Sequence, residues 1–427
     1  MKTTMFTRLA RLATRQAGRL WALGLAAGLA LTMASAGPAD AHGEKSQAAF
    51  LRMRTLGWYD LKWSKTSVSV NEEYEISGKL HIMSAGIWPA AIRVPERCFV
   101  NVGQPGAMAN RIGVWVGGQF MPRSLELING KTYEFRMVLR ARRPGHWHTH
   151  VQLSVETGGP IPGPGQYIDI KGNFADFTDP VKLLNGTTIN LETYGINSIY
   201  MWHFFWMIVG AAWIWYWFTR RGLVGRFMWV ASGKEEEVIT DQERLVGAVT
   251  LGATLLLVII GYSIAASSYP NTIPLQAGDL HNIPAVDEPA APVQIKYLGG
   301  SYKVPGRELV ANFKLTNTGK EPLRIGEFIT AGLRFLNPDV YTAKVEYPDY
   351  LLAERGLTVS DPSPIQPGET RDVTLTVQDA RWDTERLSGL AYDVDSSFAG
   401  LLFLVAPSGE KYPVELSGPV IPTFLPV

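Results

Sequence analysis

The amino-acid sequence predicts a mainly β protein with two transmembrane α-helices, in which the helices separate two β-rich domains. Short alternating segments from about residue 66 to residue 170, and again after Pro292, are typical of half-buried strands. Between them lie two apolar runs, Ile199–Phe218 and Leu245–Ala265, each with the roughly 20 residues that a membrane-spanning helix requires. The hydrophobic residues in excess of a soluble composition are concentrated in these runs, which favours a membrane protein.

The first β-rich domain is predicted from strands with period-two alternation. Ser67–Val70, Tyr74–Leu80 and Thr132–Leu139 each fit a half-buried strand, and Asn129-Gly130 is a turn signal before the last of them. Several such strands at close spacing indicate a β-sandwich of the cupredoxin or immunoglobulin kind. The following Gly/Pro-rich segment, 158–165, is expected to be a loop, and its prolines lack the amide donors that a phosphate would need.

The two apolar runs also predict an orientation. The segment that connects them carries a group of Lys and Arg residues, which places it on the cytoplasmic side by the positive-inside rule. These residues are Arg220, Arg221, Arg226, Lys234 and Arg244. Both β-rich domains are then expected on the outer side of the membrane.

The N-terminus has the pattern of an export signal. Basic residues precede an apolar run from Trp21 to Met33, and Ala39-Asp40-Ala41 fits the small-x-small cleavage pattern. An uncleaved anchor helix is the alternative. Cleavage after Ala41 would make His42 the first residue of the mature chain, with a free α-amino group.

Charge and cysteine content exclude several functions. The 40 basic and 39 acidic residues nearly cancel, so nothing favours a nucleic-acid partner. The single cysteine, Cys98, excludes an intrachain disulfide and a thiolate-cluster metal site. It lies in the strand-like segment 97–102, where we expect an inert buried thiol.

A Pro/Ala-rich linker, Ile283–Pro292, introduces the second β-rich domain. Glu308–Leu315 and Asp372–Val377 alternate as strands there. The predicted organisation is a signal peptide (1–41), a first outer domain (42–185), a helical membrane hairpin (186–268) and a second outer domain (269–427).

Three of the seven histidines fall within five residues, His146-Trp147-His148-Thr149-His150. Alternate residues of a strand point to the same face, so the three imidazoles would project together. This pattern is a moderately specific metal signal, and a solvated polar face is the alternative. His81 is expected to be structural, His203 to anchor the first helix, and His281 carries no pattern.

His42 strengthens the metal interpretation, because an N-terminal histidine offers both its amine and its ring nitrogen. Together with two strand imidazoles it would supply three or four nitrogen donors, a set that suits Cu(II), Ni(II) or Zn(II), with copper first in affinity. Glu44 is a possible additional oxygen ligand, although a solvated surface acid is the simpler interpretation.

Several segments carry a resemblance to one family. The chain resembles the B-type (beta) subunits of the particulate methane monooxygenases and ammonia monooxygenases in segments spread over the mature chain. These are His42–Gln47, Phe50–Thr55, Trp58–Asp60, Arg142–His150, Thr272–Gly278, Gly418–Pro422 and Tyr347–Ala353, the last of which favours the methane branch.

The resemblance implies two periplasmic cupredoxin-like domains joined by two transmembrane helices in a bacterial inner or intracytoplasmic membrane. It also implies a trimer of heterotrimers with subunits A and C. Its copper ligands correspond to His42, His148 and His150, and His146 is not a ligand. Some members carry a second copper site with a histidine at a position that is Gly57 here, so that site is expected to be missing.

The activity implied by the resemblance is oxidation of methane to methanol with O₂ and electrons from a quinol-type donor. The catalytic residues stay unknown, because a site in the membrane-embedded C-type partner competes for that role. Oxidation of ammonia to hydroxylamine, a purely structural role, and copper storage or delivery are the alternatives.

Overall fold

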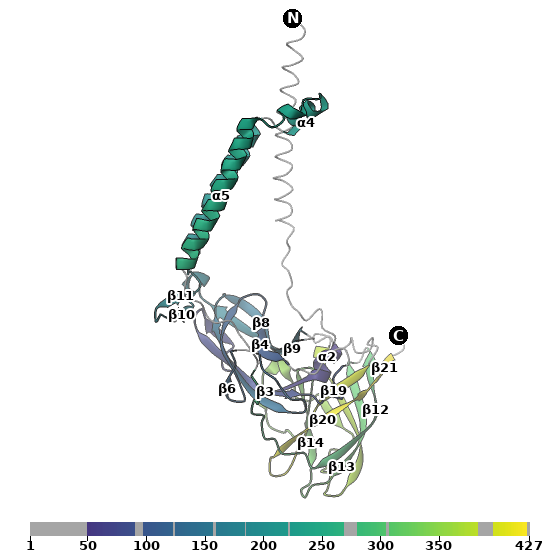
Figure 1. Ribbon diagram of the computed structural model, residues 1–427. Helices are drawn as coiled ribbons and strands as arrows, with labels where there is room; N and C mark the ends of the chain where they lie inside the picture. Colours follow the sequence, from purple (N-terminus) through teal and green to yellow (C-terminus); the bar gives the residue numbers. More distant parts are fainter. Residues whose placement is uncertain are drawn as a thin grey trace. The chain divides into compact units, whose positions relative to one another are not determined.

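The computed structural model describes residues 49–89, 97–122, 124–156, 159–183, 185–220, 223–268, 280–304, 307–382 and 396–424 (Figure 1). The chain divides into two compact units. One unit, Met1–Val68, Glu72–Lys171 and Asp279–Val427, contains both β-rich domains, and the other, Ser69–Asn71 and Gly172–Gly278, is mainly helical. The mainly β class predicted from the sequence is confirmed.

The N-terminal domain is built from a short helix and two sheets. One sheet has five strands in the order β1-β3-β7-β5-β6, and the other has four in the order β2-β9-β8-β4. The elements are α2 (Ala49–Thr55), β1 (Leu56–Trp63), β2 (Ser67–Ser69), β3 (Glu73–Ile82), β4 (Cys98–Gly103), β5 (Ala109–Val116), β6 (Gln119–Phe120), β7 (Thr132–Ala141), β8 (Gly145–Val155) and β9 (Gly159–Lys171).

Alternation along the strands places one face of each sheet in the core. On β7, Tyr133, Phe135, Met137 and Leu139 are buried, whereas the residues between them are more exposed. The turn before this strand contains Gly130 at a φ of 73°, a left-handed conformation that glycine adopts without a steric penalty. Both the strand and its turn agree with the sequence prediction.

Cys98 begins β4 and is buried, as the sequence predicts. Its Sγ donates a hydrogen bond to the Leu125 carbonyl at 3.3 Å. Burial raises the pKa of the Cys98 thiol to about 12. Because the thiolate is the reactive species, this cysteine is chemically inert at neutral pH.

The prediction that the Gly/Pro-rich segment is a loop is wrong. Its residues from Gly159 onward form the first half of β9, which pairs with β8 through Pro160, Pro162 and Gly165. Proline is tolerated in a strand where its missing N–H would face away from a partner. The three-residue strand β2 lies beside the opposite end of β9, where the Asp169 amide donates to the Thr66 carbonyl at 2.8 Å.

The C-terminal domain consists of two five-stranded sheets, in the orders β17-β18-β13-β12-β21 and β16-β15-β14-β19-β20. One core cluster draws buried side chains from both sheets, including Phe313 of β13 and Phe328 of β14, so the sheets form a sandwich. The strands are β12 (Val293–Val304), β13 (Glu308–Asn317), β14 (Arg324–Thr330), β15 (Leu333–Leu336), β16 (Leu352–Ala353), β17 (Leu357–Val359), β18 (Thr370–Gln378), β19 (Ser397–Val405), β20 (Lys411–Pro419) and β21 (Ile421–Phe424).

Buried polar side chains join the two β-rich domains. His81 of β3 lies between Thr132 Oγ1, 2.9 Å from its Nδ1, and Glu415 Oε1 of the C-terminal domain, 2.8 Å from its Nε2. Thr132 in turn donates to Glu288 of the linker at 2.9 Å, and Tyr59 also donates to Glu288. His81 is therefore structural, as predicted. The hydrogen bonds connect the N-terminal domain to the linker and to the C-terminal domain.

The helical unit begins with the short strands β10 (Pro180–Lys182) and β11 (Thr188–Asn190). It continues with the helices α3 (Ile196–Arg220), α4 (Leu223–Ala231) and α5 (Asp241–Ser268). A capping box starts α5: the Glu243 amide donates to Thr240 Oγ1 at 3.2 Å, and the Thr240 amide donates to Glu243 Oε2 at 3.0 Å. Helices α3 and α5 pack on each other where Gly261 lies against Trp202, since an added Cβ on Gly261 would be 2.9 Å from that ring.

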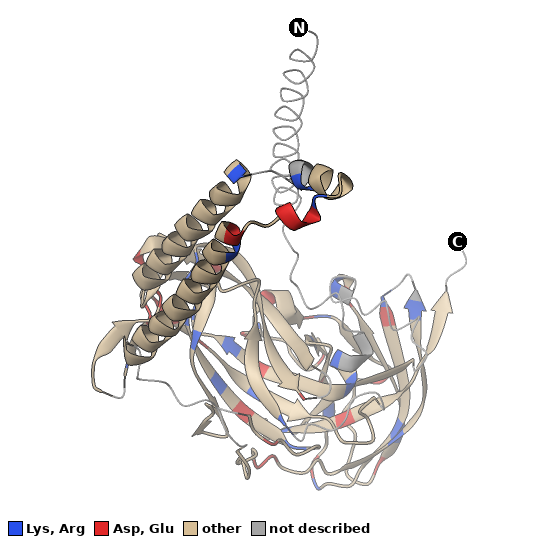
Figure 2. Ribbon diagram, turned by 45° about the horizontal axis from the view of Figure 1, so that its top comes forward, with Lys and Arg blue, Asp and Glu red and all other residues tan. Residues whose placement is uncertain are grey.

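Helices α3 and α5 are almost free of charge along their length, and their charged residues lie at the ends (Figure 2). Many of their large apolar side chains are exposed, such as Tyr200, Trp215 and Ile259. Within the described residues, α5 has the length and apolar composition of a membrane span. Helix α3 exists as predicted, but its Trp and Tyr residues lower its mean hydropathy, so its membrane crossing stays a prediction.

Candidate metal centre

His146, His148 and His150 occupy alternate positions on β8. Across the ladder they lie opposite Asp169, Tyr167 and Gly165 of β9. A register shift follows between His150 and Gln152. The long strand therefore presents three imidazoles in a row, as the sequence predicts, but their surroundings differ.

The rings of His148 and His150 form a close pair. Their centroids are 4.5 Å apart and their planes are inclined by 79°. His150 is buried, with 5% of its surface exposed, and His148 is half-buried. The Nε2 atoms of both rings are shielded from solvent, in a setting where two imidazole nitrogens can approach one metal ion.

A backbone carbonyl sets the tautomer of His150. Its Nδ1 lies 2.9 Å from the carbonyl oxygen of Gly163. Since a carbonyl oxygen only accepts hydrogen bonds, the proton of the neutral ring is on Nδ1, and the lone pair is on Nε2. Metal-binding histidines are commonly oriented in this way by a backbone acceptor on the opposite nitrogen. In this tautomer, the lone pair on Nε2 of His150 can coordinate a metal ion.

Gly165 leaves space for both rings. An added Cβ at this position would lie 2.6 Å from Cε1 of His150 and 2.8 Å from Nε2 of His148. Any side chain here would collide with the two imidazoles. The residues present therefore fit a metal ion bound through nitrogen: two neighbouring imidazoles, one fixed tautomer and backbone that leaves the donors room.

His146 is separated from this pair. Its Nδ1 lies 2.6 Å from Asp169 Oδ1, and the His146 side chain is 61% exposed. Its ring stacks on Tyr167 at 4.7 Å with an interplanar angle of only 8°. The His146 ring is thus exposed and in contact with a carboxylate and a tyrosine, and its exclusion from the ligand set stays a prediction.

Two tyrosines surround the His148 ring. Tyr167 lies 4.5 Å from it between centroids, and Tyr350 of the C-terminal domain contacts it edge to face at 5.8 Å and 80°. The two tyrosine rings are themselves 6.0 Å apart, at 83°. Both β-rich domains therefore contribute aromatic side chains around the same histidine.

His42 and Glu44 lie outside the described residues. The nearest described element, α2, begins at Ala49 and packs against β9 and β19. Seven residues of extended chain span at most about 25 Å, which bounds the reach of His42 from Ala49. Within the described part of the chain, no three His, Cys, Asp or Glu side chains come together closely enough to hold an ion.

The other predicted positions have separate surroundings. His203 Nδ1 donates to the Ile199 carbonyl of its own helix at 2.8 Å, and His281 lies 2.7 Å from Glu126. Gly57 is packed tightly, because an added Cβ would lie 2.6 Å from Leu401 Cδ1. A larger residue at position 57 would require Leu401 to move.

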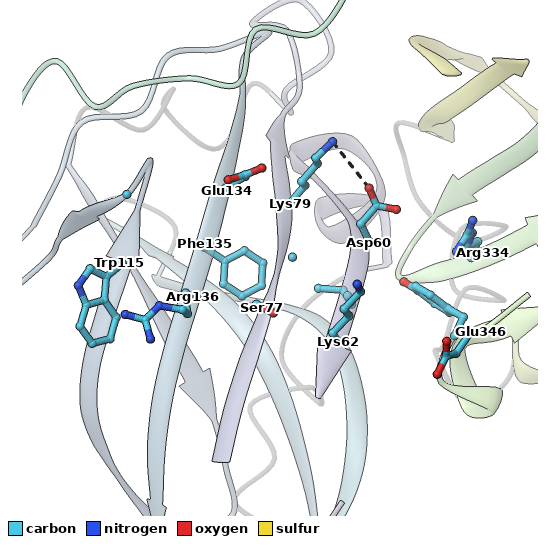
Figure 3. Close-up of a pocket in the computed structure, with 14 residues that line it drawn as sticks. Asp60, Lys62, Ser77, Lys79, Trp115, Glu134, Phe135, Arg136, Arg334 and Glu346 are labelled. Carbon is cyan, nitrogen blue, oxygen red and sulfur yellow. Dashed lines mark ion pairs between the residues drawn. The ribbon is translucent and has the colours of Figure 1, made fainter. Parts of the chain in front are cut away.

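A cavity of about 700 Å³ is lined by residues of both β-rich domains, and no histidine is among those lining residues (Figure 3). Three of the four cations that line it form ion pairs: Lys79 pairs with Asp60 and Glu288, Arg136 with Glu75, and Arg334 with Glu327. Arg136 also lies 3.8 Å above the Trp115 ring.

Sequence reasoning misses three features of the site. Gly165 belongs to a segment whose composition predicts a loop, and Tyr167 gives no signal apart from its place opposite the histidine segment. Tyr350 stands out only as a member of the family-like segment Tyr347–Ala353. A strand assignment for 159–171 would identify the first two as cross-strand neighbours of His150 and His148.

Comparison with known proteins finds one curated relative that matches nearly the whole chain. The chain is 47% identical over 404 residues to the "Particulate methane monooxygenase alpha subunit" of Methylococcus capsulatus (strain Bath), which covers 95% of this chain and 97% of that protein. Among solved structures, the cupredoxin domain of amoB from Nitrosocaldus yellowstonii aligns at 16% identity and a TM-score of 0.24, over 29% of this chain and 91% of that domain. A PapD-like domain of human CEP192 aligns at 9% identity and a TM-score of 0.16, over 36% of this chain and 99% of that domain.

The family model that describes the B-type subunit proteins of monooxygenases matches residues 43–424. The name of the Methylococcus relative uses a different subunit label, and both matches extend over nearly the whole chain. The chain belongs to the family of monooxygenase B-type subunits.

Proposed function

We propose that this chain is the copper-binding B-type (beta) subunit of a membrane-bound particulate methane monooxygenase. The complex would oxidise methane to methanol with O₂ and a quinol-type reductant. The observation that carries the proposal is the His148–His150 pair, with the His150 tautomer set by Gly163 and the space for both rings provided by Gly165. The name of the 47% identical relative supports methane as the substrate.

The proposed ligands are His42, His148 and His150. Copper would supply one-electron redox chemistry at this site. The protein's contribution is to hold nitrogen donors in place: the Gly163 carbonyl orients His150, Tyr167 packs on His148, and a shielded environment limits access of water. An all-nitrogen donor set favours copper over calcium or magnesium, which prefer oxygen ligands.

The α-amino group of His42 becomes available only if the chain is cleaved after Ala41. The family match begins at residue 43, one residue after the predicted new N-terminus, which supports the proposal. An amine has an ordinary pKa of about 7.7–8.0, so binding to a cation can displace its proton near neutral pH.

The proposal places α3 and α5 across the membrane, with both β-rich domains on the periplasmic side. The exposed apolar surfaces of both helices and the Lys and Arg residues of the segment between them support this topology. Subunits A and C would complete each protomer, and three protomers would form the trimer.

The test measures turnover and copper content of the purified complex. It compares wild type with the His148→Ala/His150→Ala double variant, with methane and with ammonia as the substrate. We expect the double variant to lose copper and to form little or no methanol. N-terminal sequencing of the mature chain should begin at His42. Full copper content and full turnover in the double variant would refute the proposal. A wild-type complex that oxidises ammonia in preference to methane would assign the chain to the ammonia branch.

A further inference from the structure

The C-terminal domain contacts the metal centre at two points, one on the His148 ring and one on the segment beside the histidine pair. One is the Tyr350 ring, which meets the His148 ring edge to face and also meets Tyr167. The other is Gly332 in the turn between β14 and β15, which lies against Pro164 because an added Cβ would be 3.1 Å from its Cγ. Pro164 is flanked by Gly163, the acceptor for His150, and by Gly165, the residue that faces both rings.

Tyr350 is held firmly by its own domain. It lies in the short 3₁₀ helix η4 (Asp349–Leu351), and Leu351 is fully buried. The Arg381 guanidinium donates to the carbonyls of Asp349, Tyr350 and Leu352 at 3.0, 2.8 and 2.9 Å. Asp379 fixes Arg381 in turn, at 2.6 Å. The ring of Tyr350 is thus presented from a rigid support.

The turn that carries Gly332 is equally specific. Ala331 and Gly332 both have positive φ, at 48° and 85°, so the chain turns sharply before β15. Thr330, just before the turn, is buried and donates to the Ala399 carbonyl at 2.7 Å. The backbone that touches Pro164 is therefore part of the C-terminal core.

We propose that the C-terminal domain is a working part of the metal centre, in which Tyr350 and the Gly332 turn position His148 and the 163–165 segment. They are positioning residues and not ligands. The inference rests on the proposed function, because it assumes that His148 and His150 bind copper. Copper binding would then stabilise the docked arrangement of the two domains, and docking of the domains would in turn strengthen copper binding.

The test compares Tyr350→Ala and Tyr350→Phe in the purified full-length complex, with Phe424→Ala as a control for loss of an exposed aromatic side chain in the same domain. Cu(II) binding is titrated after chelation, and the Cu(II) EPR spectrum is recorded. An aromatic pair of this kind corresponds to about a twofold to tenfold change in dissociation constant. We expect Tyr350→Ala to bind Cu(II) more weakly by that factor with an altered EPR spectrum, and Tyr350→Phe to resemble wild type.

A second pair of variants tests the turn. Gly332→Ala and Gly409→Ala impose the same backbone strain, since the two glycines have φ of 85° and 87°, but only Gly332 has a neighbour within contact distance. We expect Gly332→Ala alone to weaken Cu(II) binding. The gain in thermal unfolding midpoint on adding Cu(II) should also be smaller in Tyr350→Ala and Gly332→Ala than in either control.

The outcomes separate this inference from the proposed function. If His148→Ala loses Cu(II) while Tyr350→Ala and Gly332→Ala bind it with wild-type affinity and spectrum, the positioning role is wrong and the metal site stands. If His148→Ala retains Cu(II), the metal assignment itself is wrong.

Discussion

Gly165 lies opposite His150 across the β8–β9 ladder, with an added Cβ only 2.6 Å from the His150 ring. The same Cβ would lie 2.8 Å from Nε2 of His148. The absence of a side chain at this one glycine therefore leaves space for both imidazole rings. The Gly/Pro-rich character of this segment has a structural purpose at this position.

Gly165→Ala should empty the site while leaving the fold intact. The added methyl group would displace one or both rings from their present positions, and overpacking of this kind costs about 1–3 kcal/mol. We expect copper per complex to fall strongly, as measured by elemental analysis after gel filtration.

Gly86→Ala is the matched control, because a Cβ at Gly86 meets nothing within 4 Å. It should keep wild-type copper. Wild-type copper in Gly165→Ala would mean that the metal is bound elsewhere.

Glu415 should make the junction of the two domains sensitive to acid. Burial acts to raise the pKa of this carboxyl, but hydrogen bonds from His81 and the Ser84 amide outweigh it, and the pKa is lowered overall. A carboxyl with a lowered pKa in the folded state stabilises the protein above its unfolded pKa of about 4.3, and this contribution is lost as the pH falls through the folded-state pKa.

Glu415→Gln should therefore lower the thermal unfolding midpoint at pH 7, and the difference from wild type should shrink towards acidic pH. Glu156→Gln, at an exposed residue paired with Arg97 at 3.8 Å, should change little at any pH. A Glu415→Gln deficit that stays constant down to strongly acidic pH would contradict the assigned pKa direction.

Arg334→Met should destabilise the C-terminal domain. Arg334 and Glu327 form a buried ion pair at 2.7 Å, with side chains 7% and 2% exposed. Removing one partner of a buried pair costs about 3–5 kcal/mol, whereas replacing both by apolar residues is often far less harmful.

Hydrogen exchange of the β14 and β19 amides would measure this cost as a loss of local unfolding free energy. Arg334→Met/Glu327→Met should regain part of the loss, even though Lys411 and Tyr341 also contact Glu327. A double variant less protected than Arg334→Met would show that the pair contributes net stability by itself.

Cysteine labelling can test the membrane topology against a low background, because Cys98 is buried with a raised pKa. In right-side-out vesicles, a membrane-impermeant maleimide should label Ser408→Cys, an exposed position of the C-terminal domain. Ser232→Cys, exposed between α4 and α5, should react only after the membrane is opened. Labelling of both variants in sealed vesicles would contradict the two-span arrangement.

Much of the fold can be predicted from local patterns. The alternation of β7 and β13 and the apolar runs of α3 and α5 each report a local environment, which one segment of sequence carries by itself. The first half of β9 cannot be predicted in this way. Its prolines indicate a loop, and only its pairing with β8 on one side makes a strand possible.

The candidate site is predictable to the same extent. His148 and His150 can be identified because their spacing on one strand is a local property. The contacts from Gly165, the Gly163 carbonyl and Tyr350 depend on strand register and on docking of a domain about 200 residues further along the chain, which no local pattern reports.

The most direct test of the copper assignment is the Cu(II) EPR spectrum of the purified complex, compared between wild type, His150→Ala and His146→Ala. We predict nitrogen superhyperfine structure in wild type, loss of that signal in His150→Ala and its full retention in His146→Ala. A nitrogen signal that survives His150→Ala, or disappears in His146→Ala, would contradict the site described by His42, His148 and His150.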